Sequence, residues 1–134
     1  LSLLMSKYNN LSVKITFSTP LSHKTEAGAD FFLMPSRFEP CGLNQLYSMK
    51  YGTLPIVNMT GGLKDTVVDL ENKAGTGFVL SPLNPENIVK AAERAKEFYK
   101  DKESLTEARK RAMKVDSSWK KSAEEYMEVY TSLL

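Results

Sequence analysis

Two short glycine-bearing segments of the sequence could bind a ligand, and the first of them also carries a carboxylate, a thiol and an amide side chain. The first is the run from Pro35 to Asn44, and the second is Thr60-Gly-Gly-Leu63. Backbone N–H groups at the start of a helix, together with the helix dipole, favour an anion such as pyrophosphate. Four consecutive residues of the first segment are placed to offer such groups: Cys41, Gly42, Leu43 and Asn44. Gly42 also lacks a Cβ, which lets a ligand approach the backbone.

Glu39 precedes this turn and is the only carboxylate of the first segment. A carboxylate repels phosphate but accepts hydrogen bonds from the hydroxyl groups of a sugar. Amides for a phosphate beside a carboxylate for a hexose are what a sugar-nucleotide site requires. The same residues also fit a plain helix-entry turn in which Glu39 is a first-turn charge. The residue types alone leave both interpretations open.

Both segments follow short apolar runs that are typical of strands. Phe31 to Met34 is continuous, the pattern of a strand buried on both faces of a parallel sheet, and Leu54 to Val57 is a second strand. Between them, apolar residues from Gly42 to Tyr51 predict a helix that ends at Gly52. In open α/β sheets, ligands bind beyond the carboxyl ends of the strands, where loops lead into helices. Both segments are therefore predicted to lie where ligands bind.

The rest of the chain predicts alternating helices and strands. The spacing of apolar residues predicts helices over residues 1–8, 21–29, 85–99, 104–114 and 118–134. Gly28 suits a C-terminal cap, and Asn84-Pro85 is a strong helix start. Strands are predicted at 13–17 and 77–80, with a glycine-bearing loop over 60–67. This order predicts an α/β fold with a Rossmann-like, mostly parallel sheet and flanking helices.

Two features have plain structural interpretations beside the functional ones. Trp119, Tyr126 and Tyr130 could form a platform for a sugar, but their helical spacing favours an apolar stripe that serves packing. Cys41 could be simply a small buried residue, because its amide rather than its thiol is the group expected to act.

Composition limits the possible functions. A chain of 134 residues buries one hydrophobic core, and its net charge of +2 comes from interleaved basic and acidic residues, which argues against nucleic acid as a partner. One cysteine excludes an internal disulfide and a multi-thiolate metal site. No apolar run approaches the roughly 18 residues of a membrane span. We therefore expect a soluble, unexported protein that contacts no membrane.

The run from Ser36 to Pro55 closely resembles the signature of the bacterial glycogen synthases and plant starch synthases, glycosyltransferase family 5. The run from Thr60 to Val67 resembles the second signature of that family at the right spacing. The resemblance extends over essentially the whole chain, and its motifs are long and specific.

The resemblance implies a GT-B fold, in which two Rossmann-like domains face a cleft. Such enzymes transfer glucose from ADP-glucose, or in some members UDP-glucose, to the non-reducing end of an α-1,4-glucan with retention of configuration. They require no metal and no cofactor besides the donor. Residues 1–134 resemble a single, partial nucleotide-sugar-binding domain, the later part of the C-terminal one. Residues 118–134 correspond to a helix that packs back towards the N-terminal domain in the family.

The resemblance also implies roles for individual residues. Glu39 would hydrogen-bond glucose hydroxyls and help to stabilise positive charge at the anomeric carbon. The amides of 41–43 would bind glucose and the distal phosphate, and Asn44 would add a side-chain contact to phosphate. Thr60, Gly61 and Gly62 would line the same cleft. Glu26 is the candidate on the side of the base, where bacterial members often carry a tyrosine.

The chain begins at Leu1 rather than at a methionine, and the family's N-terminal domain has no counterpart in it. We therefore expect this chain alone to transfer no glucose. The alternative is a non-catalytic glucan-binding or assembly fragment that self-associates through an exposed sheet edge. The expected compartment is the cytoplasm, or the plastid for a plant protein.

Overall fold

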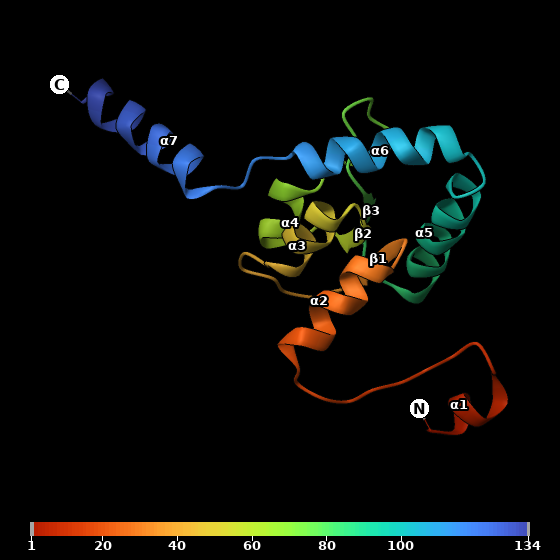
Figure 1. Cartoon of the computed structure of the whole chain (residues 1–134). Helices are drawn as coiled ribbons and strands as arrows, with labels where there is room; N and C mark the ends of the chain where they lie inside the picture. The colour runs from red at the N-terminus through yellow and green to blue at the C-terminus, as the bar shows by residue number, and fades with distance from the viewer. Residues whose placement is uncertain (1, 134) are drawn as a thin grey trace.

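The computed structural model describes residues 2–133 of the chain. A small parallel sheet lies at the centre and helices surround it (Figure 1). The elements in chain order are α1 Ser2–Lys7, α2 Thr19–Gly28, β1 Phe31–Met34, α3 Asn44–Tyr51, β2 Leu54–Asn58, α4 Gly61–Thr66, β3 Phe78–Leu80, α5 Pro85–Phe98, α6 Lys102–Lys114 and α7 Trp119–Ser132.

The sheet has three parallel strands in the order β1-β2-β3. Phe31 is paired with Leu54, and Ile56 with Phe78. All five residues of the central strand β2 are buried, as its continuous apolar run predicts. Because the strands are parallel, their carboxyl ends and the loops that follow them lie at one edge of the sheet.

Three clusters of buried side chains form the core. Leu54 of β2 packs with α3 and α6, while Ile56 packs with β3 and α5. Val57 points to the opposite face, where it packs with Leu63 and Val67 in and after α4. The inner faces of α5 and α6 carry alanines, and these small side chains let the helices lie close to the sheet.

The predicted helix ends at Asn84 and Gly52 are confirmed. The Asn84 side-chain oxygen accepts a hydrogen bond from the Asn87 amide at 2.8 Å, with Pro85 as the first residue of α5. Gly52 ends α3 at φ 80°, a left-handed conformation, and its amide donates to the carbonyl oxygens of Ser48 and Met49. These ends set the entry and exit of the helices around the sheet.

The strand predicted at 13–17 does not form. The segment has no regular structure, and Ile15 and Phe17 are 86% and 97% exposed. Alternation alone stabilises no strand, since the backbone N–H and C=O groups need a neighbouring strand to pair with. β1 is likewise an edge strand rather than one buried on both faces, and its Leu33 is 45% exposed.

Two local predictions are also wrong. The loop predicted over 60–67 contains the helix α4. Gly28 is the last residue of α2 and has no positive φ, so Ala29 rather than Gly28 caps the helix. At α4, the packing of Leu63 and Val67 accompanies the helix in spite of its two glycines.

The apolar stripe of α7 does not pack on the core in the part of the chain that the structure describes. α7 has no buried residue, and it extends away from the other elements (Figure 1). Trp119 is 89% exposed and Tyr126 63%. The predicted helix is thus confirmed, and its apolar stripe is exposed within residues 2–133.

Candidate functional site

The two segments selected from the sequence contact each other at the carboxyl edge of the sheet. The loop 35–43 follows β1, and α4 follows β2 after Met59 and Thr60. The amide of Gly62 donates a hydrogen bond to the carbonyl oxygen of Glu39 at 3.1 Å. Adjacent parallel strands therefore bring residues 39–44 and 60–62 into one region, as predicted.

Gly61 and Gly62 permit this contact because they have no side chain. A Cβ on Gly61, whose φ is 44°, would overlap the carbonyl oxygen of Glu39. A Cβ on Gly62 would overlap the backbone of Cys41 in the same way. Both glycines thus hold the loop 35–43 against the start of α4.

Glu39 is half-buried in this loop. Its carboxylate accepts a hydrogen bond from the Ser36 hydroxyl at 3.3 Å. The carbonyl oxygen of Ser36 in turn accepts from the side-chain amide of Asn58, at 2.9 Å. Asn58 ends β2 and is 8% exposed, and the sequence reasoning missed it. A polar residue that ends a buried strand was the available signal.

The turn before α3 differs slightly from the prediction. The helix begins at Asn44 instead of Gly42, and Leu43 is its N-cap residue without a side-chain capping bond. Gly42 has φ 75°, in the left-handed region that glycine adopts without strain. Cys41, Leu43 and Asn44 are exposed, so Cys41 is not the small buried residue of the plainer interpretation. The first amides of α3 therefore lie at an open surface.

Gln45 is the second residue that the sequence reasoning missed. It is fully buried, and its Nε2 group lies 3.2 Å from the Cys41 carbonyl oxygen and 3.0 Å from that of Gly42. The same group lies 3.2 Å from the hydroxyl oxygen of Thr66 in α4. The available signal was a polar residue one helical turn before the buried Met49.

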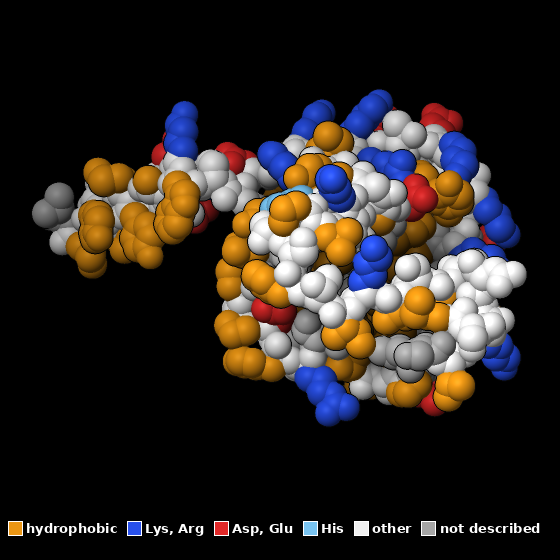
Figure 2. Space-filling model, turned by 60° about the horizontal axis from the view of Figure 1, so that its bottom comes forward, with side chains coloured by type: hydrophobic (Ala, Val, Ile, Leu, Met, Phe, Trp, Pro, Cys, Tyr) orange, Lys and Arg blue, Asp and Glu red, His pale blue; other side chains and the backbone are white. Residues whose placement is uncertain are grey.

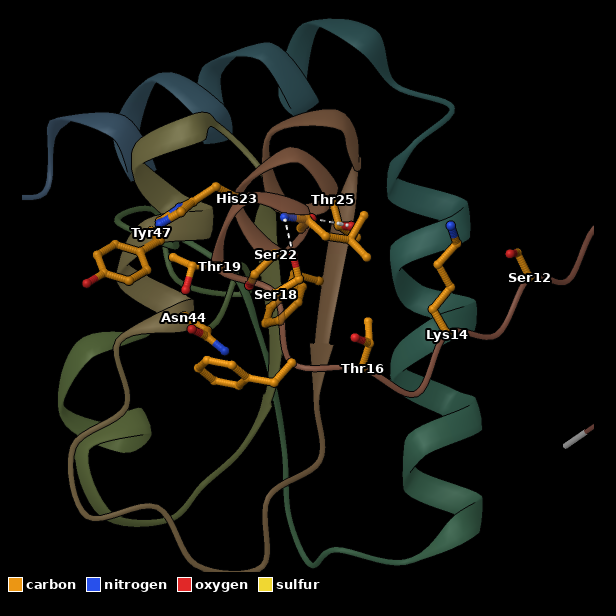
Figure 3. A pocket seen from close by; sticks show the side chains of 13 residues that line it. Ser12, Lys14, Thr16, Ser18, Thr19, Ser22, His23, Thr25, Asn44 and Tyr47 are labelled. Atoms are coloured by element: carbon orange, nitrogen blue, oxygen red, sulfur yellow. Dashed lines mark hydrogen bonds between the residues drawn. The ribbon is translucent and has the colours of Figure 1, made fainter.

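A cavity of about 740 Å³ adjoins the start of α3 (Figure 3). The segment 12–19, the helix α2 and the first turns of α3 line it. Asn44 and Tyr47 border it from α3, and Phe17 and Lys14 from the preceding segment. The lining combines hydroxyl groups, aromatic rings and one ammonium group, a set that can stack and hydrogen-bond a heterocyclic ring.

Glu26 is not brought to this cavity. Its side chain is 1% exposed, accepts a hydrogen bond from Ser22 Oγ at 3.1 Å, and lies 3.7 Å from His23 Nδ1. The Glu26 carbonyl oxygen accepts from the Thr53 hydroxyl at 2.5 Å, which fixes α2 against the start of β2. A carboxylate enclosed in this way cannot contact a base, so the structure does not support the base-side role expected for Glu26.

Residues 2–133 contain neither a cluster of metal ligands nor a membrane-spanning helix. No group of histidine, cysteine, aspartate and glutamate side chains in this range is arranged to hold a metal ion. None of the helices in the same range has the length and apolar character that crossing a membrane requires.

A parallel α/β sheet in which the loop after the first strand contacts the start of the helix α4 belongs to the open α/β folds, whose ligands bind at the carboxyl ends of the strands. The family model of the glycosyl transferases group 1 matches residues 2–115. The chain therefore belongs to the glycosyl transferases of group 1.

Curated relatives within this class are glycogen synthases. The chain is 51% identical to the enzyme of Nitrosospira multiformis over 129 residues, which cover 92% of this chain and 26% of the relative. It is 46% identical to the enzyme of Rhizobium etli over 129 residues, with coverages of 92% and 27%. The resemblance to glycogen synthases is thus confirmed, and the chain spans about a quarter of the length of these relatives.

Solved structures confirm the GT-B type of fold. The catalytic domain of starch synthase IV from Arabidopsis thaliana, bound to ADP and acarbose, superposes with a TM-score of 0.84 at 33% identity. The match covers 97% of this chain and 28% of that one. Sucrose-phosphate synthase from Thermosynechococcus elongatus matches with a TM-score of 0.66 at 23% identity, a likeness of fold alone.

Proposed function

We propose that this chain forms the donor-binding part of a retaining glucosyltransferase that extends an α-1,4-glucan in glycogen or starch synthesis. The donor is a nucleoside diphosphate glucose, either ADP-glucose or UDP-glucose. The similarity to glycogen synthases and to a starch synthase bound to ADP and acarbose supports this proposal. Since the chain spans about a quarter of its relatives, catalysis belongs to a longer enzyme.

One observation carries the proposal: the amide-bearing turn 41–44 and Glu39 lie together at the carboxyl edge of the sheet. The amides suit the diphosphate that leaves during transfer. Aimed donors of this kind typically contribute about 3–4 kcal/mol each to the stability of a charged transition state. Glu39 accepts hydrogen bonds from the glucose hydroxyls and stabilises positive charge at the anomeric carbon. Asn44 adds a side-chain contact to phosphate, and Thr60 lines the same cleft.

The cavity beside α3 is the proposed place of the nucleoside. It adjoins Asn44, and Phe17 on its rim presents a nearly fully exposed ring that a purine or pyrimidine can stack on. Phe17 replaces Glu26 as the candidate on the side of the base. The proposed reaction uses no metal and no cofactor besides the donor, and it takes place in the cytoplasm, or in the plastid of a plant.

Calorimetric titration of the chain and of its Glu39→Ala variant with ADP-glucose and with ADP tests the proposal. We expect Glu39→Ala to lower the affinity for ADP-glucose about tenfold, because it removes a hydrogen bond to a charged group. The affinity for ADP should stay within about twofold, because ADP has no glucose for the carboxylate to bind. Glu86→Ala, an exposed glutamate in the first turn of α5, is the control.

Equal losses for both ligands would contradict the role of Glu39. Binding of maltooligosaccharide without any nucleotide binding would favour the alternative, a non-catalytic glucan-binding fragment. The chain alone is expected to incorporate no labelled glucose into glycogen. Its donor-binding turn is open to water in the part described, and transfer requires that water be excluded.

A further inference from the structure

Gln45 is a buried polar side chain whose hydrogen bonds go to the turn before α3 and to the end of α4. The two N–H bonds of its Nε2 group are shared among the carbonyl oxygens of Cys41 and Gly42 and the hydroxyl oxygen of Thr66. Gln45 lies in the first turn of α3 and is 0% exposed. It therefore fixes the conformation of the turn from inside the fold.

The planar trans peptide bond determines where the N–H groups of Gly42 and Leu43 point once their neighbouring carbonyl oxygens are held by Gln45. In a trans peptide, the C=O of one residue and the N–H of the next point to opposite sides. Because Gln45 holds the carbonyl oxygens of Cys41 and Gly42 inward, the N–H groups of Gly42 and Leu43 point outward. Within residues 2–133, neither N–H donates a hydrogen bond to the protein. Both stay available to an anion.

Gln45 also couples the turn before α3 to α4. Thr66, which accepts from Gln45, donates its own hydroxyl hydrogen to the carbonyl oxygen of Gly62 at 2.6 Å. The Gly62 amide donates to the carbonyl oxygen of Glu39. The side chain of Gln45 thus connects the turn before α3 with the start of α4 and, through it, with the loop that carries Glu39.

The second polar atom of Gln45 is left without a partner. Its Oε1 is buried and accepts no hydrogen bond from the described residues. A Cβ on Gly42 would lie 2.5 Å from this oxygen, so Gly42 leaves room for it. A buried acceptor without a donor opposes folding. Within the described residues, the hydrogen bonds of the Gln45 side chain are therefore all made by its donor group.

We infer that Gln45 is a positioning residue for the phosphates of the donor. It aims the amides of Gly42 and Leu43 at the diphosphate and touches no ligand itself. The inference rests on the proposed function, because it assumes that these amides bind the diphosphate. It adds a specific expectation: loss of the Nε2 donor weakens the binding of phosphate and leaves the binding of the nucleoside unchanged.

Gln45→Met keeps the length of the side chain and removes its donor. Calorimetric titration of the 134-residue chain with ADP and with adenosine measures the two parts of the ligand separately. We expect the variant to bind ADP about tenfold more weakly and adenosine within about twofold of wild type. Ser48→Ala is the matched control: Ser48 is equally buried in α3, and its hydroxyl donates to the Gln45 backbone carbonyl, not to the turn.

The outcomes separate the two hypotheses. If wild type binds ADP no more tightly than adenosine, the turn 41–44 does not bind the diphosphate and the proposed function is contradicted. If wild type prefers ADP and Gln45→Met keeps that preference, the inference about Gln45 fails while the proposed function stands. A lower melting temperature with an unchanged ratio of the two affinities assigns Gln45 a structural role only and overturns the inference.

A second pair of variants covers the case that Gln45→Met does not fold. Thr66→Val removes the hydroxyl that Gln45 contacts, and Thr66→Ser keeps it. We expect Thr66→Val to weaken ADP binding several-fold and Thr66→Ser to leave it unchanged. Amide NMR signals of Gly42 and Leu43 should shift in the first variant only, with or without ligand. Equal ADP affinities and unshifted amide signals in both variants would overturn the inference.

Discussion

Gly62 has no positive φ, yet it is as restricted as Gly61 because a side chain there would overlap the backbone of Cys41. The restriction is one of space and not of backbone conformation. Backbone atoms of Cys41 cannot move aside as the end of a flexible side chain can. A glycine at this position therefore serves the contact between the two loops of the site.

Comparison of Gly62→Ala with Gly28→Ala tests this reason. Gly62→Ala should lower the free energy of unfolding by about 1–3 kcal/mol, the usual effect of overpacking, and should weaken ADP binding. Gly28 lies in α2 with no atom within 4 Å of an added Cβ, so Gly28→Ala should stabilise the chain by about 0.5–1 kcal/mol. Urea unfolding measures both, and equal effects would contradict a steric role for Gly62.

The two glutamates that the motif positions selected, Glu39 and Glu26, lie in different environments. Glu39 is half-buried and Gly42 lies in the turn before α3, whereas Glu26, a residue of α2, is buried. A single sequence does not tell a carboxylate that faces a ligand from one that faces the protein. Gln45 escaped notice for the same reason, since only its partners reveal its role.

At the scale of the elements, Asp69 joins the segment before β3 to α5. Its carboxylate accepts from Arg94 Nη2 at 2.7 Å and from the amides of Glu71 at 2.9 Å and Val79 at 2.7 Å. Partial burial raises the pKa of Asp69, but the hydrogen bonds from Arg94 and these amides outweigh it and lower the pKa below the ordinary 3.8. The ionised form of Asp69 therefore stabilises the fold.

Asp69→Asn should lower the free energy of unfolding near neutral pH by about 1–3 kcal/mol, because it removes charge-assisted hydrogen bonds. A depressed folded-state pKa contributes stability above the unfolded pKa, and this is lost as the pH falls through the folded-state value. Wild type and variant should therefore converge below pH 3.8. Urea unfolding across pH measures this, with the exposed Asp65→Asn as control. A difference independent of pH would refute the assignment.

The sequence predicted a helix or strand correctly where its formation depends on residues close together in the chain. The apolar run of β2, the Asn84 cap and the Gly52 terminus depend on adjacent residues, and all three form as predicted. The segment 13–17 has the alternation of a strand but no pairing partner, and it stays irregular. α4 forms over a glycine-bearing stretch because Leu63 and Val67 pack on β2.

At the scale of the whole molecule, α7 stands apart from the compact body. Its apolar side chains gather on one side of the helix, at the left of Figure 2. They belong to Trp119, Tyr126, Met127, Val129 and Tyr130, each more than half exposed. Docking of α7 on the N-terminal domain of a longer enzyme stays a prediction, as does self-association of the chain through its sheet edge.

Truncation after Ser117 tests how independent the body is of α7. We expect the free energy of unfolding to change by no more than about 0.5 kcal/mol, because α7 buries no residue. Truncation after Asp101 also removes the buried Leu105, Ala108 and Ala112 of α6 and should unfold the chain. Urea unfolding followed by circular dichroism distinguishes the two. A large loss after the first truncation would show that α7 packs on the body.

The sequence by itself determined the class of fold, the order of most elements and the position of the two site segments. Apolar runs, caps and motif spacing are local properties, and each depends on a few neighbouring residues. Only the tertiary structure decided that Gln45 holds the turn, that Glu26 is buried and that Gly62 contacts the Glu39 loop. These outcomes depend on which surfaces meet, and residues far apart in the chain set them jointly.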